Sequence, residues 1–226
     1  KEKIEEIKPS LTHQKYEMTE DVPVAYSTPN ENYATAPEVV IEDKEAYELW
    51  YSTNVKEQKQ EGYKSVYIRL TSGDFYTDEA RILAELVDDY AGDDIRISIN
   101  QGLQLRYVQE ESLPYVYSVL KSINMVKPGF DSTMDVTSCP GTTTCNLGIS
   151  DSTHTAIELE KFMAEKYPEL VFNNEIKIKI SGCMNSCGQH ALAQIGFHGS
   201  SMKEKATKKV MPALQVLLGG GVTKDG

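Results

Sequence analysis

Apolar positions recur with two different periods along the chain, beginning near Asp43. The spacing of an amphipathic helix occurs in segments 43–55, 77–90 and 114–123. The strict alternation of a half-buried strand occurs at 66–71 and 95–99. Helices and strands that alternate in this order predict an α+β unit whose helices cover one face of a sheet.

The second half of the chain continues with one helix and several strands. Asp151 or Ser152 can cap a helix that runs through Tyr167 and stops at a proline. Isoleucines at 176, 178 and 180 alternate with Lys177 and Lys179, which predicts a strand with both lysines facing solvent. Further strands are expected at 191–197 and 213–218, with the lysines at 203, 205, 208 and 209 in a solvated loop between them.

Changes in composition suggest where the domains begin and end. The first forty residues contain four of the nine prolines among acidic and small polar residues, without a sustained period. Pro128-Gly129 separates the two patterned regions. We therefore expect an extended arm or linker at 1–42, a first domain at 43–128 and a second domain at 129–226.

The charge of the chain is unevenly distributed. The formal net charge is -11, and the acidic excess lies almost wholly in residues 1–130. Neither half has the basic surface that a phosphate backbone requires, so we expect no nucleic-acid partner. No stretch has the length and hydropathy of a membrane span, and the N-terminal residues do not resemble a signal peptide, so we expect a cytoplasmic protein without membrane contact.

The two ends of the sequence suggest that it is part of a larger protein. The first residue is not methionine, and the last seven residues, 220–226, do not form a recognisable end of a domain. We therefore expect a piece of a longer chain whose second domain is truncated at its C-terminus.

All four cysteines lie in two pairs, Cys139 with Cys145 and Cys183 with Cys187. A helix and a strand separate the pairs, so four thiolates could meet at one point. Structural zinc sites usually have a shorter gap within each pair than the first gap here. A 4Fe-4S cluster also takes four thiolates and tolerates wider spacing. Disulfides or buried unligated cysteines remain a third interpretation.

The residues around the cysteines form longer motifs that resemble a known family. They are Thr137-Ser138-Cys139-Pro140-Gly141, Cys145-Asn146-Leu147-Gly148 and Ser181-Gly182-Cys183-Met184-Asn185-Ser186-Cys187-Gly188. These resemble the cluster motifs of the siroheme-dependent nitrite and sulfite reductases. The segments 58–62 and 98–103 resemble the ferredoxin-like repeat of that family. The resemblance covers residues 43–221 and implies a ferredoxin-like half-domain followed by a mixed α/β 4Fe-4S domain.

The resemblance implies a set of cofactors and ligands. Cys139, Cys145, Cys183 and Cys187 would bind a 4Fe-4S cluster, and Cys187 would also bridge to the iron of siroheme. Asn185 and Gln101 would contact the macrocycle, although a turn role for Asn185 and a strand-end hydrogen bond for Gln101 are equally simple interpretations. No catalytic residue is assigned.

The resemblance also implies partners and an activity. The parent enzyme would reduce nitrite to ammonia or sulfite to sulfide with six electrons, taken from a donor such as ferredoxin or a reductase subunit. The chain has no arginine after Arg106, whereas the family binds siroheme carboxylates and the small oxyanion substrate with cations. We therefore expect an N-terminal half of the same reductase as a partner, and no turnover by this piece alone.

Two other interpretations stay open. A precorrin-3B synthase has similar repeats and a similar cluster. A zinc-binding or electron-carrying module without catalysis of its own would also account for four cysteines.

Overall fold

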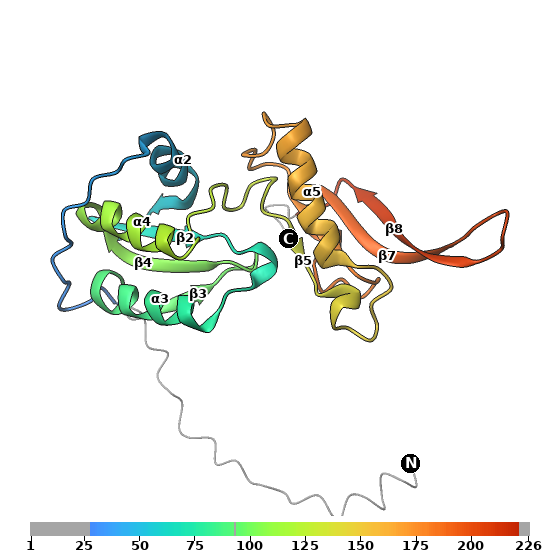
Figure 1. Cartoon of the computed structure of the whole chain (residues 1–226), viewed down its shortest axis with the longest axis horizontal. Helices are drawn as coiled ribbons and strands as arrows, with labels where there is room; N and C mark the ends of the chain where they lie inside the picture. Colours follow the sequence, from blue (N-terminus) through green and yellow to red (C-terminus); the bar gives the residue numbers. More distant parts are fainter. Residues whose placement is uncertain (1–27, 93, 222–226) are drawn as a thin grey trace, which may run out of the picture.

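The structure is a computed structural model that describes residues 28–92 and 94–221. Its elements form two lobes that lie side by side (Figure 1). The first lobe contains α2 (Lys44–Asn54), β1 (Val55–Glu57), β2 (Tyr63–Ile68), η2 (Thr71–Gly73), α3 (Thr77–Tyr90), β3 (Ile95–Ile97), β4 (Leu103–Gln109), η3 (Glu110–Ser112) and α4 (Leu113–Ser122). The second contains β5 (Thr137–Ser138), η4 (Gly141–Thr143), α5 (Ser152–Lys166), β6 (Ile178–Ser181), η5 (His190–Leu192), β7 (Ile195–Lys203) and β8 (Val210–Leu218).

The first lobe is an antiparallel sheet covered by helices, as the apolar pattern predicts. The strands are ordered β1-β2-β4-β3, and every neighbouring pair is antiparallel. Helices α3 and α4 lie against the sheet, and their apolar residues join one core around Trp50, which is fully buried. Asp43 accepts a hydrogen bond from Ala46 N at 3.0 Å and so caps α2.

Strand β3 differs from the others in what its side chains contact. It forms where the alternation of isoleucines predicts it, but Ile95, Ile97 and Ile99 are exposed. The physical reason is its place at the edge of the sheet, where it pairs only with β4. Alternation therefore identified the strand but not its burial.

Residues 28–42 contain no helix or strand and pack along the first lobe. Ala34 N donates to Asp89 O at 3.0 Å, and Tyr33 OH donates to Tyr107 O at 2.5 Å. Ala34, Ala36 and Ile41 pack against the core of this lobe. The rest of the expected arm, residues 1–27, lies outside the described residues.

The second lobe is a mixed sheet with α5 packed against it (Figure 1). The strand order is β5-β6-β7-β8; the pairs β5-β6 and β6-β7 are parallel, and β7-β8 is an antiparallel hairpin that extends away from the rest of the lobe. Asp151 accepts from His154 N at 3.1 Å and caps α5, as expected. Helix α5 connects two adjacent parallel strands, which is the βαβ arrangement.

The predicted exposure of the β6 lysines is wrong for Lys179. All four residues of β6 are buried, and Lys179 is only 8% exposed. Strand β6 pairs with parallel strands on both sides, and strands of parallel sheets are normally covered on both faces, so alternation does not mark a solvent face here. Lys177, just before the strand, is half-buried and forms an ion pair with Asp131 at 2.9 Å.

Helix lengths and hydropathy also bear on membrane contact. Among the residues that the structure describes, no helix combines the length and the apolar character that crossing a bilayer requires.

Candidate functional site

Two of the four cysteines follow directly from parallel strands. Cys139 is the residue after β5, and Cys183 lies two residues after β6. Ser138 and Ile180 are register partners in this parallel pair, so both strands deliver their cysteines to the same edge of the sheet. In open α/β sheets, ligands bind outside this carboxyl edge.

The thiol of Cys139 lies among hydrogen-bond donors. Gly182 N donates to Cys139 Sγ at 3.0 Å, so the two cysteine loops are joined at this atom. Ser152, the first residue of α5, lies 3.5 Å from the same sulfur through its Oγ and donates to Cys139 O at 2.6 Å. The N-terminus of a helix carries partial positive charge, so α5 favours negative charge at this position.

Glycines allow the cysteine loops to come into backbone contact. A Cβ on Gly182 would lie 2.5 Å from Gly141 Cα, and a Cβ on Gly188 would lie 2.0 Å from Ile180 O. Neither distance leaves room for a side chain, and the neighbouring atoms are backbone. The motif glycines are therefore required by close packing around the thiols.

The loop from Cys183 to Cys187 is held at its end by a buried pair of side chains. Gly188 N donates to Ser181 Oγ at 3.0 Å, and His190 Nδ1 lies 2.8 Å from the same oxygen. Burial lowers the pKa of His190, and the neighbouring His198 lowers it further. His190 is therefore neutral near pH 7 and acts here as a support for the loop that carries Cys187.

The four cysteines are free and differ in exposure. Cys139 and Cys183 are buried, whereas Cys145 and Cys187 are exposed. Among the residues described, no group of three or more Cys, His, Asp or Glu side chains is arranged to hold a single metal ion. A four-iron cluster makes a different demand, because each thiolate binds its own iron atom. That the four thiolates bind one cluster stays a prediction.

Two buried polar atoms beside the cysteine loops are left without partners. They are Ser138 Oγ, next to Cys139, and Gln189 Oε1, two residues after Cys187. Buried polar atoms are normally hydrogen-bonded, so unpaired ones mark a place where a bound group can supply the missing contact.

Asn185 and Gln101, the other two residues that the sequence singles out, differ in their contacts. Asn185 is exposed in the loop between Cys183 and Cys187. Gln101 lies in the first lobe and binds the backbone of Ser138 with both ends of its side-chain amide, at 2.7 and 3.0 Å. This is the strand-end hydrogen bond that the sequence left open for Gln101; a contact of either residue with a macrocycle stays a prediction.

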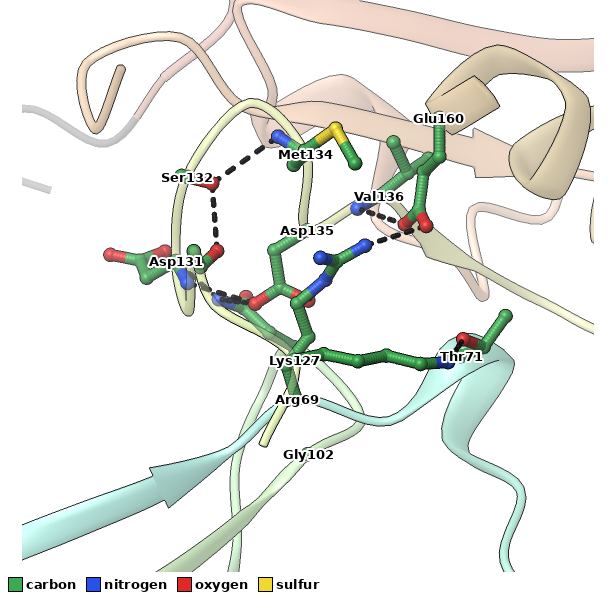
Figure 2. Close-up of polar contacts among 12 residues, drawn as sticks. Arg69, Thr71, Gly102, Lys127, Asp131, Ser132, Met134, Asp135, Val136 and Glu160 are labelled. Atoms are coloured by element: carbon green, nitrogen blue, oxygen red, sulfur yellow. Dashed lines mark hydrogen bonds and ion pairs between the residues drawn. The ribbon is translucent and has the colours of Figure 1, made fainter. Parts of the chain in front are cut away.

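A buried ion network joins the two lobes beside β5 and was missed by sequence reasoning. Figure 2 shows Arg69, from the segment after β2, lying between Asp135 and Glu160 of the second lobe. Arg69 donates to Glu160 Oε2 at 2.6 Å and to Pro128 O at 3.1 Å, and its Nε lies 3.6 Å from Asp135 Oδ1. Glu160 also accepts from Val136 N at 3.3 Å. The network therefore fixes the strand that leads to Cys139.

Burial strongly affects the titration of two groups at this junction. Burial raises the pKa of Asp135 to about 6, and Glu160 and Asp131 add to the increase. The N–H of Asp131 and the charge of Arg69 act in the opposite direction but do not offset burial. Burial likewise lowers the pKa of Lys179, whose Nζ lies 3.1 Å from Thr137 Oγ1.

The two lobes correspond to two family models, which together define a class of redox protein in which a ferredoxin-like half precedes an iron–sulfur domain. Residues 56–123 match the family model of the nitrite/sulfite reductase ferredoxin-like half domain. Residues 129–226 match the model of the nitrite and sulphite reductase 4Fe-4S domain. The two matches cover most of the chain, so it belongs to the nitrite and sulfite reductase family. This membership confirms the predicted fold class and implies a 4Fe-4S cluster and siroheme as cofactors.

Individual relatives agree with this assignment. The chain is 26% identical over 192 residues to ferredoxin–nitrite reductase of Synechococcus elongatus, a match that covers 85% of this chain and 36% of the relative. It is 27% identical over 196 residues to the chloroplastic ferredoxin–nitrite reductase of Zea mays, covering 84% and 33%. A sulfite reductase hemoprotein beta-component of Mannheimia succiniciproducens is 28% identical over 124 residues, covering 53% and 20%.

A solved structure shows the same fold. The Mycobacterium tuberculosis NirA protein matches with a TM-score of 0.65 and 22% identity, covering 76% of this chain and 32% of that one. The chain thus spans about a third of the length of the first relatives it matches.

Proposed function

We propose that this chain is the cluster-carrying part of a reductase that converts nitrite to ammonia with six electrons. The observation that carries the proposal is the placement of Cys139 and Cys183 at the carboxyl edge of parallel strands, with Gly182 N donating to Cys139 Sγ at 3.0 Å. Nitrite is the substrate in the names of the relatives whose matches cover most of this chain. The sulfite reductase relative makes sulfite the second candidate.

The proposed ligands of the 4Fe-4S cluster are Cys139, Cys145, Cys183 and Cys187. The four cysteines fit a 4Fe-4S cluster, because all four thiols are free. The loops that carry Cys139 and Cys183 also come into backbone contact at Gly182. The N–H of Gly182 and the N-terminus of α5 beside Cys139 would stabilise the negative charge of a thiolate ligand.

Cys187 is the proposed link to siroheme. It is exposed, so its sulfur can meet a second group, and the loop that carries it is held by Ser181 and His190. A shared thiolate would join cluster and siroheme into one electron-transfer unit, which supplies electrons to the bound oxyanion. Ser181 and His190 of this chain would orient that thiolate through the loop that carries it.

The cations at the junction beside β5 and β6 support a division of the active site between two parts of a larger protein. The family membership implies siroheme, whose carboxylates need cationic partners. Arg69 and Lys177 are committed to ion pairs, and Lys179 is buried. We therefore propose that an N-terminal half of the same reductase supplies the cations for siroheme and oxyanion. Ferredoxin, named in the nitrite reductase relatives, is the proposed electron donor.

The test is anaerobic loading of the chain with iron and sulfide, followed by measurement of iron, sulfide and zinc per chain. We expect about four irons per chain and the visible absorption of a cluster. Replacing Cys139 with serine should abolish the cluster. Met184→Ser is the matched control, because Met184 is an exposed sulfur-containing residue of the same loops, and it should load like the unaltered chain.

Two results would contradict the proposal. One is uptake of zinc with no stable iron. The other is a cluster that survives unchanged in the serine variants of Cys139 or Cys183, because the four cysteines would then not be its ligands.

A further inference from the structure

A turn of the first lobe reaches across to the residue that precedes Cys139. The turn joins β3 to β4 and is closed by Ser98 N, which donates to Gly102 O at 2.8 Å. From it, Gln101 Nε2 donates to Ser138 O at 2.7 Å, and Gln101 Oε1 accepts from Ser138 N at 3.0 Å. Both ends of one side-chain amide therefore bind the N–H and C=O of one residue.

These two bonds replace a neighbouring strand. Strand β5 is at the edge of its sheet and pairs only with β6. On its other side Ser138 would have an unpaired N–H and C=O, which is costly because Ser138 is buried. The amide of Gln101 has the donor and acceptor of a peptide group and satisfies both. The next residue, Cys139, is held on the β6 side by its N–H, which donates to Ile180 O at 3.2 Å.

The backbone of the turn indicates that the side chain of Gln101 is required there. Gln101 has φ of 64°, in the left-handed region where glycine is favoured. A non-glycine residue in this conformation costs free energy, and such positions persist where surrounding contacts hold them. Asn100 adds a contact across the same junction, because its Nδ2 donates to Asp131 Oδ1 at 2.9 Å.

We propose that Gln101 is a positioning residue for the cluster: by clamping the backbone of Ser138, it fixes the thiol of Cys139 from the other lobe. The inference rests on the proposed function, in which Cys139 is a cluster ligand. Both polar ends of Gln101 are already used by Ser138, so its action on the site runs through the backbone of β5. The ferredoxin-like lobe then contributes directly to the geometry of the iron–sulfur site.

The test compares Gln101→Met with Gln104→Met. Methionine has a similar length and no amide, so the first variant removes both bonds to Ser138. Gln104 likewise forms two side-chain hydrogen bonds, donating to Ser65 Oγ at 3.2 Å and to Tyr67 OH at 2.9 Å, but both partners lie in the first lobe. The control therefore loses an equal number of bonds without changing the junction.

The first readout uses the metal-free chain. We expect iodoacetamide to alkylate Cys139 about tenfold faster in Gln101→Met, because the local opening of β5 costs less, with exchange of the Ser138 amide increased by a similar factor. The exposed Cys145 and Cys187 serve as internal references and should react at unchanged rates. Gln101→Glu keeps the acceptor for Ser138 N–H but places a carboxylate oxygen against Ser138 O, so it also breaks the clamp and should accelerate alkylation of Cys139.

The second readout uses the chain after loading with iron and sulfide. Chelator-driven loss of iron should be about tenfold faster in Gln101→Met than in Gln104→Met, as for other residues that orient metal ligands. Equal rates for the two variants in both readouts would overturn the proposal. A uniform increase at all four thiols would also overturn it, because Gln101 would then support the fold in general.

The two proposals can fail separately. If the unaltered chain takes up no cluster, the proposed function fails, whereas alkylation and exchange in the metal-free chain still decide whether Gln101 positions Cys139. If Gln101→Met does not fold, Gln101→Glu gives the decision through the same measurements.

Discussion

Replacing Asp135 with asparagine should change how the stability of the protein depends on pH. Asp135 is 7% exposed at the junction of the lobes, where it faces Arg69, Glu160, Asp131 and, through its field, Lys179. Burial raises the pKa of Asp135 from 3.8 to about 6. The positive charge of Arg69 offsets only part of this increase, because Arg69 binds Glu160 at 2.6 Å and approaches Asp135 only to 3.6 Å. The nearby cation is thus largely used by the other carboxylate.

The sign and size of the effect follow from this shift. The folded chain holds the proton of Asp135 more tightly than the unfolded chain does. Its favourable contribution is therefore fully present below pH 3.8 and is lost as the pH rises through about 6. The difference between the folded and the unfolded pKa of Asp135 corresponds to about 3 kcal/mol in the free energy of unfolding. Asparagine cannot titrate, so the stability of the unaltered chain minus that of Asp135→Asn should fall by about 2 kcal/mol between pH 4 and about pH 7, since part of the full contribution is already lost at pH 4.

Urea unfolding of both chains across this pH range, at constant ionic strength, measures the difference. Other carboxylates titrate in the same window, but they are common to both chains and cancel in the subtraction. Asp74→Asn, at an exposed aspartate of the first lobe, is the matched control and should show no comparable fall. A difference that stays constant or increases with pH would refute the reasoning, because attraction by Arg69 would then outweigh burial.

Two further substitutions test the packing around the site. Gly188→Ala should destabilise the fold by about 2 kcal/mol in urea unfolding, because the Cβ of the alanine would lie 2.0 Å from Ile180 O. The control is Asn185→Ala, in the exposed part of the same loop, which should have little effect on stability. Equal losses of stability in the two variants would contradict the predicted clash. Arg69→Met should cost about 3 kcal/mol, since it leaves the buried Asp135 and the half-buried Glu160 without their cation. The exposed Arg81→Met is its control, and a loss no larger than that of the control would show that the junction does not depend on Arg69.

Local patterns predicted most of the secondary structure, because they depend on neighbours in the sequence. Asp151 caps α5 where the sequence predicts a cap, and the cysteine motifs lie on the expected loops. The burial of Lys179 could not be predicted, because it depends on both faces of β6 being covered by parts of the chain that are distant in sequence. The bonds between Gln101 and Ser138 depend on a contact between the lobes, and the spacing of apolar residues along the chain cannot predict such a contact. The ion pairs of Arg69 with Asp135 and Glu160 also join the two lobes, so they could not be predicted from the sequence pattern either.

The contacts that sequence patterns missed share one location, and this bears on how the two lobes divide their roles. Gln101, Asn100 and Arg69 all come from the first lobe, and each contacts the segment between Asp131 and Ser138, immediately before Cys139. Burying charge and amide groups at a junction is costly unless each is paired, and here they pair across the lobes. A flexible connection between the lobes would not need such pairing. We infer that the ferredoxin-like lobe serves as a rigid support for the first cysteine, so disturbance at residues 69 or 101 should reach the cluster without changing any of its ligands.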